Sequence, residues 1–141
     1  MPYQFIEHTA DIAVEISANS IEDLFSTSCY AWRDAALEIK NSSSTDEQTI
    51  SLSADSFEEL LVQLLSELNF LLSIKHWVFN SVKKIEFLPG EKSNKLFIII
   101  LGEPFDKNIH HFKVEIKAVT FHQMKIEKKG DEYSTRIVFD I

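Results

Sequence analysis

Residues 3–18 read YQFIEHTADIAVEISA, with a dense polar cluster between two apolar stretches. The flanks, residues 3–7 and 12–18, predict two short strands. In the second strand Ile12, Val14 and Ile16 alternate with small or polar residues. Polar side chains between two strands favour a solvated turn or paired groups, because an unpaired buried polar group costs free energy. The stretch therefore predicts two strands joined by a turn, a natural place for a functional site on a rigid scaffold.

Two amphipathic helices follow. Ser20 resembles an N-cap, and the apolar spacing after it predicts a first helix over about residues 21–37. The strongest helical pattern runs over residues 57–72, where leucines recur at helical spacing after Ser56, a second candidate cap. We expect the sheet to pack on this second helix.

The rest of the chain is rich in strand patterns. The expected strands are residues 49–52 (an edge strand), 78–88, 95–101 (buried on both faces), 112–122, 124–128 and 133–141. Residues 41–48 and 102–111 are expected to be irregular, and residues 129–131 to form a hairpin turn. Two helices among many strands predict an α+β fold. We expect two main helices packed on mostly antiparallel sheet, in a single domain over residues 1–141.

Composition narrows the functional classes. The 141 residues carry a formal net charge of −8, which argues against broad non-specific nucleic-acid binding, because such binding needs a basic face. No apolar run approaches the ~20 residues of a membrane helix, and no signal peptide is evident, so we expect a cytoplasmic protein without membrane contact. The single Cys29 lies in a helical, apolar context and is expected to be a buried structural thiol.

The candidate chemistry centres on carboxylates. The final predicted strand ends in Asp140 and Ile141, and the Asp140 side chain and the Ile141 α-carboxylate lie close in sequence. If Asp11 faced them, three carboxylates would converge, and a hard cation such as Ca²⁺ would relieve their repulsion. No local pattern brings Asp11 to Asp140, so solvated acids remain the simpler interpretation.

The histidines offer little evidence of a site. They show no zinc-ligand spacing, and His8 remains open as a general base or a ligand. We expect His110 and His111 to lie on a loop without a functional role, and His122 to end a strand. A Ser-His-Asp triad assembled by the fold stays open, but no local pattern favours it. Taken alone, the residues argue against catalysis.

Several segments together carry a family resemblance. Residues 7–12, EHTADI, and residues 114–122, VEIKAVTFH, resemble the opening signature EHTADIG and the second signature of the archease family. Residues 68–72, LNFLL, are similar to its L-N-E-L-[LI] segment, and the ending Asp140-Ile141 matches the family's terminus. These segments occur in the same order over nearly the whole chain.

The resemblance implies a small α+β protein that activates an RtcB-type RNA ligase in tRNA splicing and RNA repair and is not itself an enzyme. It implies that such a protein promotes ligase guanylylation and multiple turnover, and touches tRNA only indirectly. It also implies a metal site at Asp11, Asp140 and Ile141, for Ca²⁺ or alternatively Mg²⁺. We expect Glu7, His8 and Thr9 to support this site or to contact the partner.

The sequence also departs from the family pattern. Ala13 replaces the usual Gly, Glu67 stands where an aromatic residue is common, and Phe70 stands where an acid is common. If the acid that is common at position 70 contacts the partner in other family members, the partner surface of this protein differs from theirs. Two other functions remain open: a metal-dependent hydrolase of RNA or nucleotides with His8 as base, and a chaperone-like module for RNA-processing proteins.

Overall fold

The computed structural model describes residues 2–7, 11–40, 42, 44, 46–88, 90 and 93–141. For Glu7 it describes the backbone but not the side chain. The first sheet joins the two ends of the chain. Its strands are β1 (Tyr3–Glu7), β2 (Asp11–Ala18), β8 (Ala118–Thr120), β9 (Glu127–Lys129) and β10 (Glu132–Asp140). Their order is β1-β2-β10-β8, β9 also pairs with β10, and every pair is antiparallel.

Alternation along β2 explains which face of this sheet packs on the rest of the molecule. Ile12, Val14 and Ile16 are buried, whereas Glu15 between them is exposed. Side chains of successive strand residues point to opposite faces, so the apolar set packs inward and the polar set lines an outer face. The candidate carboxylates lie in the polar set.

The second sheet has the order β4-β6-β5, all antiparallel, with β4 (Asp46–Ala54), β6 (Asn94–Pro104) and β5 (Trp77–Leu88). A short pair joins β3 (Leu37–Ile39) to β7 (His110–Phe112). Gly102 on β6 is required by close packing, because an added Cβ would lie 2.1 Å from the Val78 carbonyl oxygen. It would also lie 2.4 Å from the Trp77 ring.

Both helices begin at the expected serine caps. In α1 (Ile21–Ala36) the Ser20 hydroxyl accepts from the Asp23 N–H, and in α2 (Phe57–Ser73) Ser56 accepts from Glu59 in the same way. Each cap satisfies an N–H group that the first helical turn leaves without a partner. The predicted helices and their starts are confirmed.

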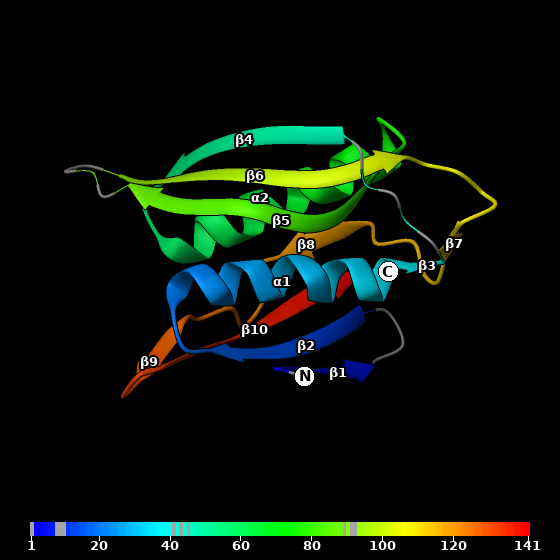
Figure 1. The fold of residues 1–141 in the computed structure, drawn as a ribbon. Helices are drawn as coiled ribbons and strands as arrows, with labels where there is room; N and C mark the ends of the chain where they lie inside the picture. Colours follow the sequence, from blue (N-terminus) through cyan, green and yellow to red (C-terminus); the bar gives the residue numbers. More distant parts are fainter. Residues whose placement is uncertain are drawn as a thin grey trace.

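The helices connect the two sheets. α1 contacts β2 and β5, while α2 contacts β4, β5, β6 and β8. In Figure 1, α1 runs between the sheet of β1, β2 and β10 and the sheet of β4, β5 and β6. Apolar side chains from both sheets and both helices share one core cluster, with Trp32, Phe25 and Phe139 fully buried. The predicted α+β architecture is confirmed, and Cys29 is buried within it as expected.

The prediction of one strand over residues 112–122 is wrong. Only residues 110–112 and 118–120 are strands, because backbone groups between them bond to other elements. The Lys113 N–H donates to the Ala36 carbonyl at the end of α1, and the Asn69 side chain on α2 donates to the Ile116 carbonyl. Tertiary partners thus replace a strand ladder here.

Three smaller corrections concern strand extents and faces. β4 begins at Asp46, earlier than expected, although it is an edge strand as predicted. β3 was not predicted at all. β6 is not buried on both faces: Leu96, Ile98 and Ile100 are buried, but the side chains between them are only partly covered, because the helices pack on one face.

The expectation that His110 decorates a loop is also wrong. His110 is buried, and its Nε2 lies 3.1 Å from Oε1 of Glu103. Its Nδ1 accepts the N–H of Asp106 at 2.8 Å, so the ring proton of neutral His110 sits on Nε2 and is donated to Glu103. This bonding ties the segment after β6 to β7 and has a structural role.

Candidate metal centre

Asp11 and Asp140 are direct partners across two antiparallel strands. Asp11 begins β2, Asp140 ends β10, and the register pairs them opposite each other. Side chains of directly opposed residues lie on the same face of a sheet, roughly 5 Å apart at Cβ. The pairing places two carboxylates side by side, a juxtaposition that no local sequence pattern predicted.

The end of β10 is held on both of its edges. β2 pairs with one edge, while Ala118 of β8 lies opposite Asp140 on the other. The Lys117 N–H donates to the Asp140 carbonyl at 2.8 Å, and the side chain of Ile141 packs against the core. The backbone on either side of the Asp140 carboxylate is therefore fixed.

The chemistry of this pair fits a hard cation. Asp140 is exposed and Asp11 is partly buried, so a cation could keep part of its hydration shell. Carboxylate oxygens are the ligands that Ca²⁺ and Mg²⁺ prefer. Among the described residues, no group of three or more His, Cys, Asp or Glu side chains is arranged to hold a metal. A complete site here needs a further oxygen donor, for which Ile141 is the nearest in sequence.

The other predicted site residues cannot be placed. His8, Thr9 and the side chain of Glu7 lie outside the described residues, and the Glu7 backbone pairs with Ile12. Their expected support of the site stays a prediction.

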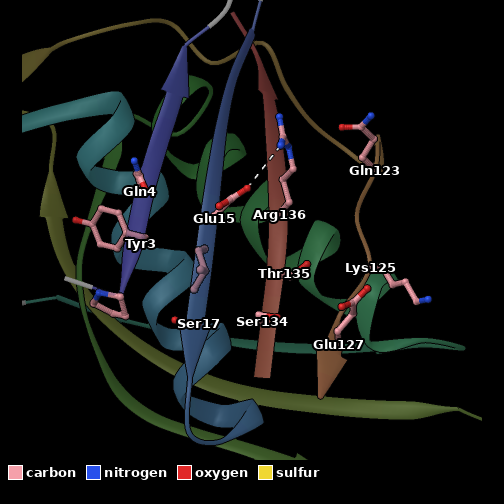
Figure 2. A pocket seen from close by; sticks show the side chains of 12 residues that line it. Tyr3, Gln4, Glu15, Ser17, Gln123, Lys125, Glu127, Ser134, Thr135 and Arg136 are labelled. Carbon is pink, nitrogen blue, oxygen red and sulfur yellow. Dashed lines mark ion pairs between the residues drawn. The ribbon is translucent and has the colours of Figure 1, made fainter. Parts of the chain in front are cut away.

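A polar pocket of about 500 Å³ lies farther along the same sheet and was not predicted. Its lining includes Gln4, Glu15, Ser17, Gln123, Lys125 and Arg136. Figure 2 shows Arg136 beside Glu15, with the segment that carries Gln123, Lys125 and Glu127 across from them. Arg136 and Glu15 are cross-strand partners, so the pocket, like the carboxylate pair, depends on strand register.

Tyr3 ties the edge of this sheet to α1. Its hydroxyl donates to a carboxylate oxygen of Asp34. Burial, followed by this hydrogen bond, raises the pKa of Tyr3 to about 12. The neutral phenol is thereby kept as a donor well into the alkaline range.

Residues 3–141 match the family described as the "Archease protein family (MTH1598/TM1083)". The chain belongs to the archease family. It is 32% identical to "Protein archease" of Methanopyrus kandleri over 141 residues, covering 100% of both chains. It is 30% identical to "Protein archease" of Methanosarcina acetivorans over 139 residues, covering 99% of this chain and 95% of the relative.

Two solved structures share the fold of this archease family member. Protein 1598 of Methanobacterium thermoautotrophicum has a TM-score of 0.86 at 22% identity, with 99% of each chain covered, and supports the fold alone. An archease of Thermotoga maritima, described as a possible chaperone, has a TM-score of 0.61 at 27% identity. That alignment covers 96% of this chain and 94% of the other.

The residues that depart from the archease signatures lie on β2 and α2. Ala13 is a buried residue of β2 and is not among the positive-φ residues, so the missing glycine causes no backbone strain there. Phe70 is 42% exposed on α2, and Glu67 is partly buried. Within the described part of this archease, no helix is both long and apolar enough to cross a membrane.

Proposed function

We propose that this archease is a cytoplasmic, non-enzymatic activator of an RtcB-type RNA ligase. It promotes guanylylation and multiple turnover of the ligase, and reaches tRNA only through that partner. The observation that carries the proposal is the opposition of Asp11 and Asp140, because a cation or a cationic partner would offset the repulsion of two carboxylates on one sheet face.

Asp11, Asp140 and Ile141 would hold a divalent cation in this proposal. Ca²⁺ is the expected ion and Mg²⁺ the alternative, since all three donors are oxygens. When bound, the cation supplies positive charge and Lewis acidity. These residues would hold the cation at the end of β10, and the ion would supply positive charge beside the nucleotide site of the ligase.

Multiple-turnover ligation tests this proposal. The assay uses limiting cognate ligase, GTP and divalent metal, with wild-type protein or with Asp11→Asn or Asp140→Asn. Both variants should fold normally but lose stimulation, because each keeps the side-chain shape and removes one charge. Asp131→Asn, in the exposed turn at the other end of β10, is the matched control and should stimulate fully. Full stimulation by both site variants would refute the role of the metal site.

A direct metal measurement separates binding from activation. Isothermal titration of the protein with Ca²⁺ alone should give saturable binding that Asp140→Asn removes. Stimulation that depends on Asp11 and Asp140 without any measurable metal binding would instead indicate direct contact of these carboxylates with the ligase.

A chaperone-like module is the second candidate. The description of the Thermotoga structure favours it, and so does an exposed aromatic ring: Phe112 is 58% exposed and stacks on the partly buried Phe105. Exposed apolar groups are what a chaperone offers to unfolded clients. General protection of RNA-processing proteins from aggregation, undiminished in Asp11→Asn and Asp140→Asn, would favour this function over ligase activation.

A further inference from the structure

The pocket on the first sheet lies where the strand ladder of β10 is interrupted. β8 pairs with residues 138–140 and β9 with residues 132–134. On this edge no described strand pairs with residues 135–137. The segment between β8 and β9 instead lines the pocket with Gln123 and Lys125, and its Ile126 N–H donates to the Glu58 side chain. Such an interruption leaves room for main-chain hydrogen bonds from another extended segment.

Arg136, in the middle of this interruption, is poorly satisfied. Its Nη1 lies 3.6 Å from Oε1 of Glu15, which is beyond hydrogen-bonding distance. Its Nε is shielded from solvent and has no hydrogen-bond partner among the described residues. An unsatisfied buried donor is costly, so rotation of the side chain toward a ligand that accepts from Nε and Nη is favourable.

Gln123 supplies a second, independent sign of a binding site. It has a φ of 57° in the turn that the Met124 N–H closes onto the Phe121 carbonyl. This left-handed position normally favours glycine or asparagine. A glutamine held there is strained, and its amide lines the pocket across from Arg136 (Figure 2).

The charges of the pocket select the class of ligand. Arg136 and Lys125 are balanced by Glu15 and Glu127, and the whole protein carries a formal net charge of −8. Such surroundings repel a polyanion but tolerate one negative charge on a guanidinium. A single carboxylate with neighbouring amide groups fits these side chains and the open strand edge.

We propose that this pocket binds a short acidic peptide segment of a partner protein, with one carboxylate on the Nε and Nη donors of Arg136. Main-chain amides of the peptide bond to the unpaired edge of β10 and to Gln123. The inference does not depend on the proposed function, since it requires no metal. Arg136 lies four residues from Asp140, or ~13 Å along the strand.

Nuclear magnetic resonance of arginine side chains tests this proposal. The sequence has two arginines, so two Nε–H signals are expected, and Arg136→Lys assigns them by removing one. Arg33 is an internal reference, because its Nε already donates to Asp34 at 3.2 Å. The probes are N-acetyl-Gly-Glu-Gly-amide, its Gln counterpart and inorganic phosphate.

The Glu peptide should move the Arg136 signal saturably and leave the Arg33 signal in place. The Gln peptide and phosphate should bind at least about tenfold more weakly, since one lacks the charge and the other lacks the amides. No saturable movement with the Glu peptide would overturn the proposal. Stronger binding of phosphate would overturn it in favour of a phosphate ligand.

Gln123→Gly provides a variant that should fold well. Glycine accepts the left-handed conformation, so thermal stability should be kept or raised, whereas binding of the Glu peptide should weaken about fivefold through loss of the amide contact. Unchanged peptide affinity in Gln123→Gly would contradict the role given to this side chain. Arg136→Lys should also weaken binding, because lysine keeps the charge but loses the planar fork.

Discussion

The opposed carboxylates of Asp11 and Asp140 should lower the stability of the metal-free protein. Like charges directly across a strand pair are unfavourable, by an amount that solvent keeps small when one partner is exposed. A binding cation would reverse this effect and stabilise the folded state in proportion to its occupancy. The same pair would thus act against the fold without metal and favour it with metal.

Asp140→Asn should therefore stabilise the metal-free protein, by about 0.5 kcal/mol in urea unfolding with a chelator present. Adding Ca²⁺ at about a hundred times its Kd should stabilise the wild type by roughly 2.7 kcal/mol and leave the variant unchanged. Asp131→Asn again serves as the control. Loss of stability in chelated Asp140→Asn would show that the two carboxylates do not repel each other.

Tyr3 should make stability fall in the alkaline range. Its folded pKa of about 12 lies above its ordinary value of 10.0, so the unfolded state loses the phenolic proton first as pH rises. Its contribution is fully present below pH 10.0 and decreases as the pH rises toward about 12. Burial also raises the pKa of the Cys29 thiol above its ordinary value of 9.0. This shift adds a second loss of folding stability, which begins near pH 9.0.

Tyr3→Phe should remove the tyrosine part of this decline. The free energy of unfolding should be measured from pH 9.0, the ordinary pKa of a thiol, up to about pH 12, the folded pKa of Tyr3. Over this range it should fall less steeply in Tyr3→Phe than in the wild type. Tyr133→Phe, on β10 and away from Asp34, is the matched control and should keep the wild-type slope. Equal slopes in Tyr3→Phe and the wild type would show that ionisation of Tyr3 does not cause the alkaline loss of stability.

At the scale of elements, Asn69 on α2 connects parts that sequence patterns leave separate. Its Oδ1 accepts from Trp32 Nε1 of α1 at 3.2 Å, and its Nδ2 donates to the Ile116 carbonyl at 2.9 Å. The next residue, Lys117, bonds to the Asp140 carbonyl. Both helices thereby fix the irregular segment that braces the end of β10.

Asn69→Ala should destabilise the protein by about 2 kcal/mol, because it leaves the Trp32 donor and the Ile116 acceptor unsatisfied. Exchange of the Lys117 amide hydrogen should accelerate more than that of β6 amides, since the brace opens locally. Trp32→Phe is the control, because it removes the indole N–H but keeps the bond to Ile116. Uniform acceleration in Asn69→Ala would show a general loss of stability rather than a local brace.

At the scale of the whole molecule, the excess of acidic residues affects how fast the protein associates with a partner. A protein with a formal net charge of −8 approaches a basic partner faster at low salt, because exposed charges attract over about 10 Å at 0.1 M ionic strength. If the proposed ligase partner is basic around its nucleotide site, its association with this protein should be partly electrostatic. This argument concerns the rate of encounter more than the final contacts.

The concentration of archease that gives half-maximal ligase stimulation should therefore rise severalfold between about 0.05 M and about 0.5 M salt. The control is the salt dependence of the ligase alone in single turnover. A half-maximal concentration that is constant or falls with salt would mean that apolar contacts dominate docking.

The sequence by itself determined the local elements of this protein. Helical spacing and serine caps marked α1 and α2, and alternation marked β1, β2, β5 and β10, because these signals arise between residues a few positions apart. The motifs identified the family for the same reason, since they are short and ordered. The sequence also singled out both aspartates of the candidate site, but only the family resemblance placed them in one site.

Only the tertiary structure decided which side chains meet. Strand register pairs Asp11 with Asp140 and Glu15 with Arg136, although more than a hundred residues separate the members of each pair. Residues 113–117 are irregular because α1, α2 and β10 take their backbone hydrogen bonds, and His110 is buried because Glu103 satisfies it. Local periodicity carries no information about such distant partners, since register depends on how both sheets pack around the shared core.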